Sequence, residues 1–367
     1  MSYLDEPGDL VAAVPAMLGF VPERSLLVVV LTDSACEPQI GSAFVSAVLR
    51  FDLELPAEFT GDLAEIIANA VIRICDSADS TEVLAVIVDD RVTTPPPPWV
   101  TAEPQANVAL ITALAQHLDD AEIGLVGGWA TAAIESGQLW WSVLGDRDQG
   151  AIPDPETSVA AVALSGVDNQ VFASRAELVA LVELDPEKAE QVGRSLPSAR
   201  ATVQRRYAAK LLDGDPDGGT RWALKRVLKV IAALDSGCLP TDYRAAELAV
   251  ILADRRVRDG LLATALSNYA RPAEALWTHL TRTLPSPERA EAATLLAYSA
   301  YVRGNGPLAG IAVQTALDAV PYHHFALLLE ASLEIGLDPL TVRRLGRSGA
   351  EAMRGLGIEI DLPEASS

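Results

Sequence analysis

The residues VPAMLGFVPERSLLVVVL, from Val14 to Leu31, contain a helix end, a tight turn and a buried strand. Gly19 adopts a positive φ without strain, which suits the C-terminal cap of a helix, and Pro22 prevents that helix from continuing. The run Leu26–Leu31 is apolar at every position and rich in valine. Such a run is typical of a strand that is covered on both faces. This segment therefore predicts a sheet that begins at Leu26 and has helices on its faces.

The apolar patterns on either side alternate between strand and helix. Strands are expected at residues 26–32, 43–51, 83–88, 122–126 and 138–144, and helices at 7–18, 57–75 and 104–118. Helical crossovers imply parallel pairing, whereas closely spaced strand pairs imply antiparallel pairing. The first half is therefore expected to form an α/β domain, with one mixed sheet of about five strands and flanking helices.

From about Val159 onward the sequence shows helical patterns and no strand pattern. Helices are expected at residues 159–164, 175–181, 187–211, 221–234, 243–253, 273–284, 287–303, 307–319, 322–335 and 339–355. We therefore predict two domains, an acidic α/β domain over residues 1–185 and an all-α domain over residues 186–367.

Residues 290–323 resemble one tetratricopeptide repeat, whose period is ~34 residues. The matching positions are Leu296, Ala297, Ala309, Ala316 and Pro321, while Ala293 stands where the repeat usually has tryptophan. The pair of helices that follows is only a partial match, and stable arrays need at least three repeats. We therefore expect helical-hairpin packing that is partly tetratricopeptide-like, rather than a solenoid.

The charge of −22 is confined to the first half of the chain. Residues 1–185 contain 29 acidic residues, six arginines and no lysine, whereas residues 186–367 contain 21 acidic and 22 basic residues. This asymmetry indicates either a partner-binding surface or a strongly solvated acidic surface. Either way the first half should repel nucleic acid, since binding to nucleic acid requires neutralisation of phosphates.

Three scattered cysteines without CxxC spacing exclude a disulfide framework and a cysteine zinc site, and they suit a reducing cytoplasm. The run Leu26–Leu31 is too short to span a bilayer. The acidic residues Asp5, Glu6 and Asp9 differ from the positive start of a signal peptide. We therefore expect a cytoplasmic protein that is not associated with a membrane.

Five motifs together resemble one family. They are LGFVPERSL at 18–26, WWS at 140–142, SRAEL at 174–178, VRD at 257–259 and AYVRG at 300–304. In this order they are similar to the actinobacterial domain of unknown function 4192 (DUF4192) family, and the resemblance covers most of the chain. Members of that family often have cysteines just after the WWS motif, where this chain has Gly145 and Gly150. The resemblance implies no reaction, substrate or cofactor, and a cysteine-based metal or redox role is not expected here.

The motifs of several large enzyme classes are missing from the sequence. There is no Gly-Lys-Ser/Thr of a phosphate-binding loop, no Gly-x-Ser-x-Gly and no His-Glu-x-x-His. Adjacent His323 and His324 would project about 100° apart on a helix, which is poor geometry for one metal ion. The sequence therefore predicts no metal site from its histidines or cysteines.

Asp89 and Asp90 end an apolar strand, and ligands of α/β sheets bind beyond the carboxyl ends of strands. Carboxylates are ligands that Mg²⁺ prefers, but aspartates at a strand end also serve simply as turn residues. Trp99 and Trp129 flank the later strands, where they either line a ligand pocket or pack in the core. Strand alternation places Trp140 and Trp141 on opposite sides, which suggests one in the core and one exposed.

Two other segments have charged residues near predicted strands. Glu23 and Arg24 lie in the turn before Leu26, and therefore at the start of a strand, which is the less usual edge for a site. They are secondary ligand-binding candidates. The group Asp146-Arg147-Asp148 follows the last strand and is expected at the edge opposite Asp89. Pro95–Pro98 should form a stiff connector, with a lid or partner ligand as alternatives.

Arg221, Lys225 and Lys229 fall at i, i+4 and i+8, and therefore on one face of a helix. This basic face is a candidate for nucleic-acid binding or for docking on the acidic first half of the same chain. We favour intramolecular docking, because the acidic segment is tethered nearby.

These patterns lead to two hypotheses. The favoured one is a binding or scaffold protein whose helical hairpins present a surface to a protein partner. The alternative is a small-ligand or metal-dependent enzyme or sensor with its site at the sheet edge, near Asp89, Asp90 and the tryptophans. The second hypothesis requires a cavity that meets several of those side chains. Neither hypothesis implies a particular cofactor or oligomeric state.

Overall fold

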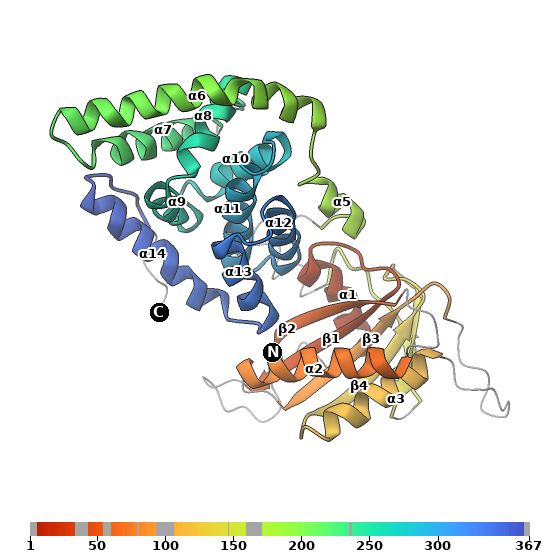
Figure 1. The fold of residues 1–367 in the computed structure, drawn as a ribbon. Coiled ribbons are helices and arrows are strands. Elements are labelled where there is room, and N and C mark those ends of the chain that lie inside the picture. Colours follow the sequence, from red (N-terminus) through yellow and green to blue (C-terminus); the bar gives the residue numbers. More distant parts are fainter. Residues whose placement is uncertain are drawn as a thin grey trace. The chain divides into compact units, whose positions relative to one another are not determined.

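The computed structural model describes residues 6–33, 43–53, 60–78, 81–92, 106–145, 147–158, 171–234 and 237–362 (Figure 1). The chain divides into two compact units. The first consists of Met1–Glu177 with Glu334–Gly336, and the second of Leu178–Leu333 with Leu337–Ser367. An α/β region followed by a helical region is thereby confirmed. The predicted division into domains at residues 185 and 186 stays a prediction.

The first unit contains one mixed sheet with the strand order β2-β1-β3-β4-β5-β6. The strands are β1 Ser25–Asp33, β2 Ala43–Asp52, β3 Glu82–Val88, β4 Gly124–Thr131, β5 Leu139–Leu144 and β6 Gln149–Ala151. The pair β3–β4 is parallel, and every other neighbouring pair is antiparallel. The five predicted strands are present. The strand β6 is not predicted from the sequence, because its three residues are all small or polar and give no apolar pattern.

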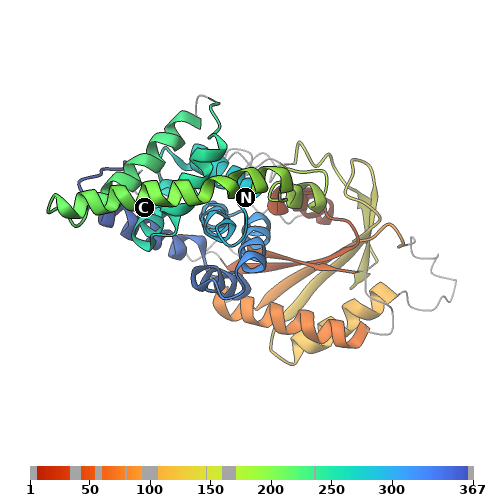
Figure 2. The same ribbon diagram turned by 45° about the horizontal axis from the view of Figure 1, so that its top comes forward.

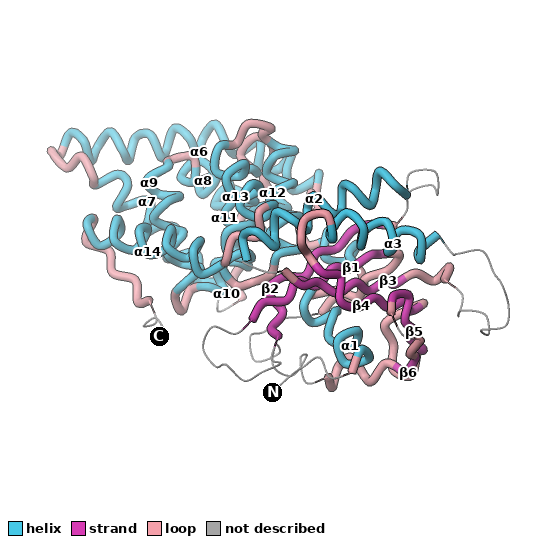
Figure 3. Tube along the Cα trace, turned by 90° about the horizontal axis from the view of Figure 1, so that it is seen from below, coloured by secondary structure: helices cyan, strands magenta, loops and turns pink. Residues whose placement is uncertain are grey.

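Helices cover both faces of this sheet (Figures 2 and 3). The helices α2 Thr60–Ala78 and α3 Ala106–Asp119 lie on one face, and α1 Pro7–Leu18 lies on the other. Alternate side chains of β1 therefore enter two different cores. Leu26 and Val28 pack with α2 and α3, while Val29 packs with Leu10 of α1. This double coverage explains why the segment Leu26–Leu31 of β1 is apolar at every position.

The strand β4 differs from the prediction, which ended it at residue 126. It continues to Thr131 through Gly127 and Gly128. A Cβ at Gly127 would lie 2.5 Å from the Trp129 ring, so glycine makes room for the indole. The glycine pair is therefore required for packing within the strand, although two adjacent glycines in a sequence are typical of a turn.

Trp140 and Trp141 point to opposite faces of the sheet, as predicted. Trp141 belongs to the core that α2 and α3 cover. Trp140 lies close to Gly8 of α1 and Gly150 of β6, where a Cβ would stand 2.9 Å and 2.8 Å from its Nε1. Both indoles are buried, at 5% and 6% exposure. The suggestion that one of them is exposed is therefore wrong, because helices cover both faces.

The turn between α1 and β1 has the predicted cap. Gly19 has a φ of 75°, and its N–H donates to the carbonyl of Pro15 at 2.8 Å. Phe20 then forms a parallel bridge with Phe172. Val21 N–H donates to Phe172 O at 3.0 Å, and Phe172 N–H donates to Gly19 O at 2.8 Å. These bonds bring the segment that precedes α5 Arg175–Ala180 against the turn.

The second unit consists of helices. They are α6 Pro186–Leu212, α7 Gly218–Leu234, α8 Asp242–Leu252, α9 Arg255–Leu261, the 3₁₀ helix η2 Leu262–Leu266, α10 Ala270–Thr283, α11 Arg289–Val302, α12 Gly306–Ala319, α13 His324–Glu334 and α14 Pro339–Gly355. The sequence missed α9 and η2, whose short lengths give little periodicity. The predicted helix at 159–164 lies outside the described residues.

The helices α11 and α12 pack against each other as a hairpin. Most of α11 is buried, including Leu296 and Tyr298, because α10, α12 and α14 surround it. The helical hairpin expected over residues 290–323 is therefore present, while its likeness to a tetratricopeptide repeat stays a prediction. Within the described ranges, no helix combines the length and the apolar character that crossing a membrane requires.

Candidate functional site

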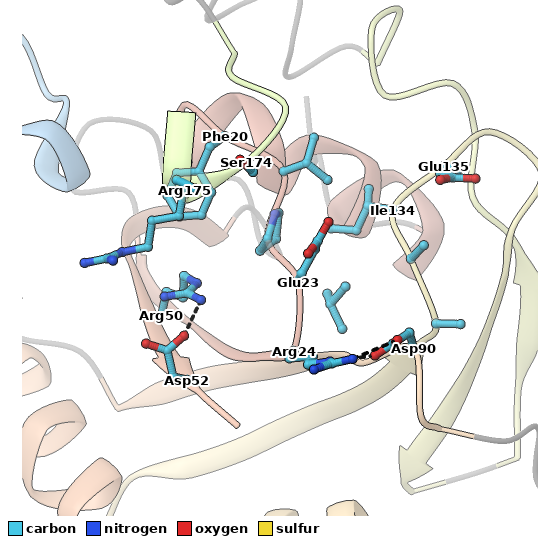
Figure 4. A pocket seen from close by; sticks show the side chains of 16 residues that line it. Phe20, Glu23, Arg24, Arg50, Asp52, Asp90, Ile134, Glu135, Ser174 and Arg175 are labelled. Atoms are coloured by element: carbon cyan, nitrogen blue, oxygen red, sulfur yellow. Dashed lines mark hydrogen bonds and ion pairs between the residues drawn. The ribbon is translucent and has the colours of Figure 1, made fainter. Parts of the chain in front are cut away.

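A pocket of about 700 Å³ opens at one edge of the sheet in the first unit (Figure 4). Five segments line it: the turn at residues 20–24, the end of β2 with Arg50 and Asp52, the end of β3 with Val88 and Asp90, residues 132–135 after β4, and residues 174–176 at the start of α5. This volume is typical of sites that enclose small organic molecules.

The strand directions explain why these segments meet. The strand β1 is antiparallel to both neighbours, so that Ser25 stands opposite Asp52 of β2 and Val88 of β3. Because β3 and β4 are parallel, Val88 also lies beside Thr131. One edge of the sheet therefore carries the start of β1 and the ends of β2, β3 and β4. The expectation that Glu23 and Arg24 lie at the less usual edge is wrong, because antiparallel pairing puts them beside the carboxyl end of β3.

Arg24 and Asp90 form a two-point ion pair across this edge. Nε of Arg24 donates to Oδ1 of Asp90 at 2.9 Å, and Nη2 donates to Oδ2 at 3.3 Å. The hydrogen bond from Arg24 lowers the pKa of the Asp90 carboxyl below its ordinary value, with the positive charges of Arg24 and Arg91 adding to the effect. The structure therefore joins two residues that the sequence proposed separately.

The backbone of Arg24 adopts a conformation that favours glycine. Its φ is 41°, which places a side chain in the left-handed region. Its carbonyl accepts a hydrogen bond from Leu53 N–H at 2.8 Å, so the turn is attached to the end of β2. Strained backbone of this kind persists where the surroundings fix it, often at ligand sites.

Asp89 is buried, at 2% exposure, and its carboxylate is held by Arg91. Nε of Arg91 donates to Oδ1 at 2.8 Å, Nη2 donates to Oδ2 at 2.8 Å, and the backbone N–H of Arg91 donates to Oδ1 at 3.0 Å. Nη2 of Arg91 also reaches Leu53 O at 3.0 Å. Asp89 is not among the residues that line the pocket. Its contacts connect the ends of β2 and β3.

Each of the two adjacent aspartates thus accepts hydrogen bonds from an arginine. A divalent cation would have to displace that arginine in order to bind the carboxylate. Among the residues that the structure describes, no three histidine, cysteine, aspartate or glutamate side chains gather closely enough to hold a metal ion.

Arg50 lies on the pocket wall beside Phe20. Its Nη2 donates to Oδ1 of Asp52 at 2.5 Å, and its guanidinium stands 5.6 Å above the centre of the Phe20 ring. The Arg50 side chain is 15% exposed, and its buried Nε has no hydrogen-bond partner among the described residues. Arg50 is not among the residues predicted for the site, although a charged residue inside an apolar strand is the available signal in the sequence.

Arg175 lines the pocket from the start of α5, and its side chain extends on the same side as Arg50, away from Glu23 (Figure 4). The segment is fixed by a reciprocal cap, in which Ser174 Oγ accepts from Glu177 N–H at 3.3 Å and Glu177 Oε2 accepts from Ala173 N–H at 3.1 Å. Arg175 itself is exposed and makes no hydrogen bond or ion pair with another described residue. The SRAEL motif at 174–178 is recognisable in the sequence, but no local signal connects it with the site.

Residues 132–135 form the wall opposite Arg175. The Thr131 hydroxyl donates toward Ala133 O at 2.8 Å and Leu139 O at 3.0 Å, which fixes the start of this loop. Ile134 is buried, while Glu135 is exposed at the rim. The carboxylates of Glu23 and Glu135 have no hydrogen-bond or ion-pair partner among the described side chains, so both are available to a ligand.

The remaining predicted residues lie elsewhere. Trp129 is half-buried against the core under α1 and does not line the pocket, and Trp99 lies outside the described residues. Pro95–Pro98 and Asp146 are also outside them. Arg147 follows β5, which is antiparallel to β4, so the structure confirms its place at the opposite edge.

The basic face of α7 is only partly free. Nη1 of Arg221 donates to Asp215 at 2.8 Å, and its Nε donates to Leu356 O at 2.9 Å. Lys225 and Lys229 are exposed. Docking of this face on the acidic half of the chain stays a prediction.

Comparison with protein families identifies a match over most of the chain. The profile of a family described as "Domain of unknown function (DUF4192)" matches residues 7–340, which include every residue that lines the pocket. No curated protein and no solved structure matches the chain.

Proposed function

The chain belongs to the DUF4192 family, and from this premise we propose that its α/β unit binds a small polar ligand in the pocket at the sheet edge. One observation carries the proposal, namely that five separate segments of the chain converge on this pocket. It corresponds to the second of the two hypotheses from the sequence, that of a ligand site near Asp90.

The walls of the pocket are held in place before any ligand arrives. Arg24–Asp90 joins the turn to the end of β3, and Arg91 joins the end of β3 to Leu53. The pairing of Phe20 with Phe172 holds the start of α5 near the turn. A ligand that enters a preformed site loses less affinity to the ordering of the protein.

The lining favours binding over nucleophilic catalysis. Among the described lining residues there is no histidine, cysteine or lysine. The hydroxyl of Ser174 takes part in the cap of α5 and has no adjacent base. Glu23 and Glu135 provide carboxylates that accept hydrogen bonds from a ligand.

The test is a thermal-shift screen of the full chain against a library of small polar metabolites, because a ligand that binds the folded state raises Tm by mass action. Ala176→Trp, on the pocket wall, should abolish every shift that the wild type shows. Ala180→Trp is the matched control, since Ala180 is exposed on the same helix and does not line the pocket. A screen without any shift, or shifts that survive in Ala176→Trp, would contradict the proposal.

We propose protein binding by the helical unit as a second function. It is favoured by large apolar side chains that are exposed on and around α13 and α14, namely Tyr322 at 90%, Leu328 at 53% and Leu340 at 60%. Exposed apolar surface of this kind is typical of interaction sites. The tetratricopeptide-like hairpin and the scaffold role predicted from the sequence belong to this proposal.

Affinity capture with matched variants tests this second function. A partner that wild type recovers should be lost with the double variant Tyr322→Glu, Leu328→Glu. The control Leu211→Glu, at a residue exposed at 67% on α6, should retain it. Equal recovery by all three proteins would exclude the surface of α13.

A further inference from the structure

We infer that the pocket takes a zwitterion of the amino-acid or short-peptide type, with its carboxylate on Arg50 and Arg175 and its ammonium group near Glu23 and Glu135. This inference rests on the proposed function and specifies the class of ligand.

The cationic side of the pocket is formed by Arg50 and Arg175 (Figure 4). The guanidinium of Arg50 makes one hydrogen bond within the described residues, from Nη2 to Asp52, so the donors on Nη1 have no partner there. Stacking on Phe20 and 85% burial fix its position. Arg175 comes from a separate element and has no partner among the described residues. A planar guanidinium binds a carboxylate through two parallel hydrogen bonds, and the pocket has two such side chains on one side.

The anionic side is formed by Glu23 and Glu135. Figure 4 shows Glu23 in the middle of the pocket and Glu135 across from Arg175. Asp90 lies on the same wall but is already paired with Arg24, so it does not contribute a free charge. Two carboxylates without partners are suited to an ammonium group, which has three donors and no acceptor.

The charge of the surrounding unit argues against a strongly anionic ligand. Residues 1–185 contain 29 acidic residues and six arginines, so the unit repels anions and attracts cations at long range. A phosphate monoester has a charge of about −2 at neutral pH and therefore meets more repulsion than a single carboxylate. A zwitterion has no net charge to be repelled, and its ammonium end is attracted.

The size and the apolar lining favour a short peptide over a free amino acid. Phe20, Pro22 and Ile134 give the pocket apolar walls between its charged sides. Its volume of about 700 Å³ is in the range that encloses drug-sized ligands. A dipeptide or tripeptide has that size, with opposite charges at its two ends.

The test is titration calorimetry on the full chain with a pooled library of dipeptides and tripeptides that have free termini. The best binder is then compared with its N-acetylated and C-amidated forms. We expect each capped form to bind at least tenfold more weakly. Glucose 6-phosphate is the comparison ligand, because its phosphate is an alternative anion for Arg50 and Arg175.

Matched variants identify which residue binds the carboxylate end of the peptide and which binds the ammonium end. Arg175→Gln should weaken the free peptide at least tenfold and leave the amidated form unchanged, since that form has no carboxylate to lose. Glu135→Gln should weaken the free peptide and leave the acetylated form unchanged. Arg147→Gln, at the opposite edge of the sheet, should affect none of them.

The outcomes separate the two proposals. If glucose 6-phosphate binds, Ala176→Trp abolishes that binding and no peptide binds, the zwitterion proposal is overturned and the proposal of a ligand pocket is kept. Peptide binding that capping does not weaken would also overturn the zwitterion. No binding of any probe, together with a screen that shows no thermal shift, would overturn both.

Discussion

Arg24 donates to both carboxylate oxygens of Asp90, although 66 positions separate the two residues along the chain. The pair exists because β1 runs antiparallel to β3, which places the residue before β1 beside the residues after β3. It closes one part of the sheet edge and leaves Glu23, the neighbour of Arg24, free to face the pocket. The same contact therefore both shapes the pocket and decides which of its carboxylates are available.

The backbone of Arg24 should be strained, and two substitutions isolate that strain. Both Arg24→Gly and Arg24→Ala remove the ion pair with Asp90, but only glycine adopts a φ of 41° without a steric penalty. We expect Arg24→Gly to be more stable than Arg24→Ala by about 1 kcal/mol in urea denaturation. If the alanine variant were equally stable or more stable, the turn would not hold residue 24 in the left-handed region.

The buried carboxylate of Asp89 should contribute to stability. Replacement by asparagine removes the negative charge that accepts three hydrogen bonds from Arg91. We expect Asp89→Asn to lower the free energy of unfolding by about 1–3 kcal/mol, because hydrogen bonds to charged groups are stronger than neutral ones.

The neighbouring Asp90 provides the control for this prediction. Its side chain is 62% exposed, so Asp90→Asn should leave the thermal midpoint unchanged within error. Equal destabilisation by the two variants would mean that burial does not distinguish these adjacent carboxylates.

The sequence predicts those features of the fold that depend on neighbouring residues. The cap at Gly19 and the buried strand at Leu26–Leu31 follow from backbone freedom and from the continuous apolar run, and both are present. The predicted fourth strand ends before Gly127, because glycine is common in turns. The packing of Gly127 against Trp129 is recognisable only in three dimensions.

The site was only partly predictable, for a related reason. Asp90, Glu23 and Arg24 were proposed as separate candidates, since a sequence shows which residues end a strand but not which strands are antiparallel. Arg50 lay inside a predicted strand, and Arg175 lay in a distant segment. The bridge between Phe20 and Phe172, which brings Arg175 to the pocket, has no local signal in the sequence.

The two cysteines that the structure describes should differ in reactivity. Cys75 is buried in α2, and this burial, aided by the negative charge of Asp76, raises the pKa of its thiol from 9.0 to about 11. Cys238 is exposed. At pH 8 we expect Cys75 to react with a thiol reagent at least about a hundredfold more slowly than Cys238, because the thiolate is the reactive form.

The measurement uses a Cys36→Ser background, because Cys36 lies outside the described residues. The raised pKa also means that the folded state holds the Cys75 proton more tightly than the unfolded state. Its stabilising contribution is therefore present below pH 9 and is lost as the pH rises through 11. In guanidinium chloride both thiols should react alike. Equal rates in the native protein would contradict the burial of Cys75.

Two glycines in the helical unit should respond oppositely to the same substitution. A Cβ at Gly349 of α14 would lie 2.5 Å from the backbone oxygen of Asp259 and 3.1 Å from that of Gly260, so alanine would force α14 away from α9. We expect Gly349→Ala to lower the free energy of unfolding by about 2–3 kcal/mol. Gly310 of α12 has open space around its Cβ position, so Gly310→Ala should raise stability by about 0.5–1 kcal/mol through helix propensity alone.

Both changes replace glycine by alanine inside a helix, so propensity predicts the same sign for both. Opposite signs in urea denaturation would therefore measure the close approach of α14 to α9, and stabilisation by both variants would show that these helices lie further apart.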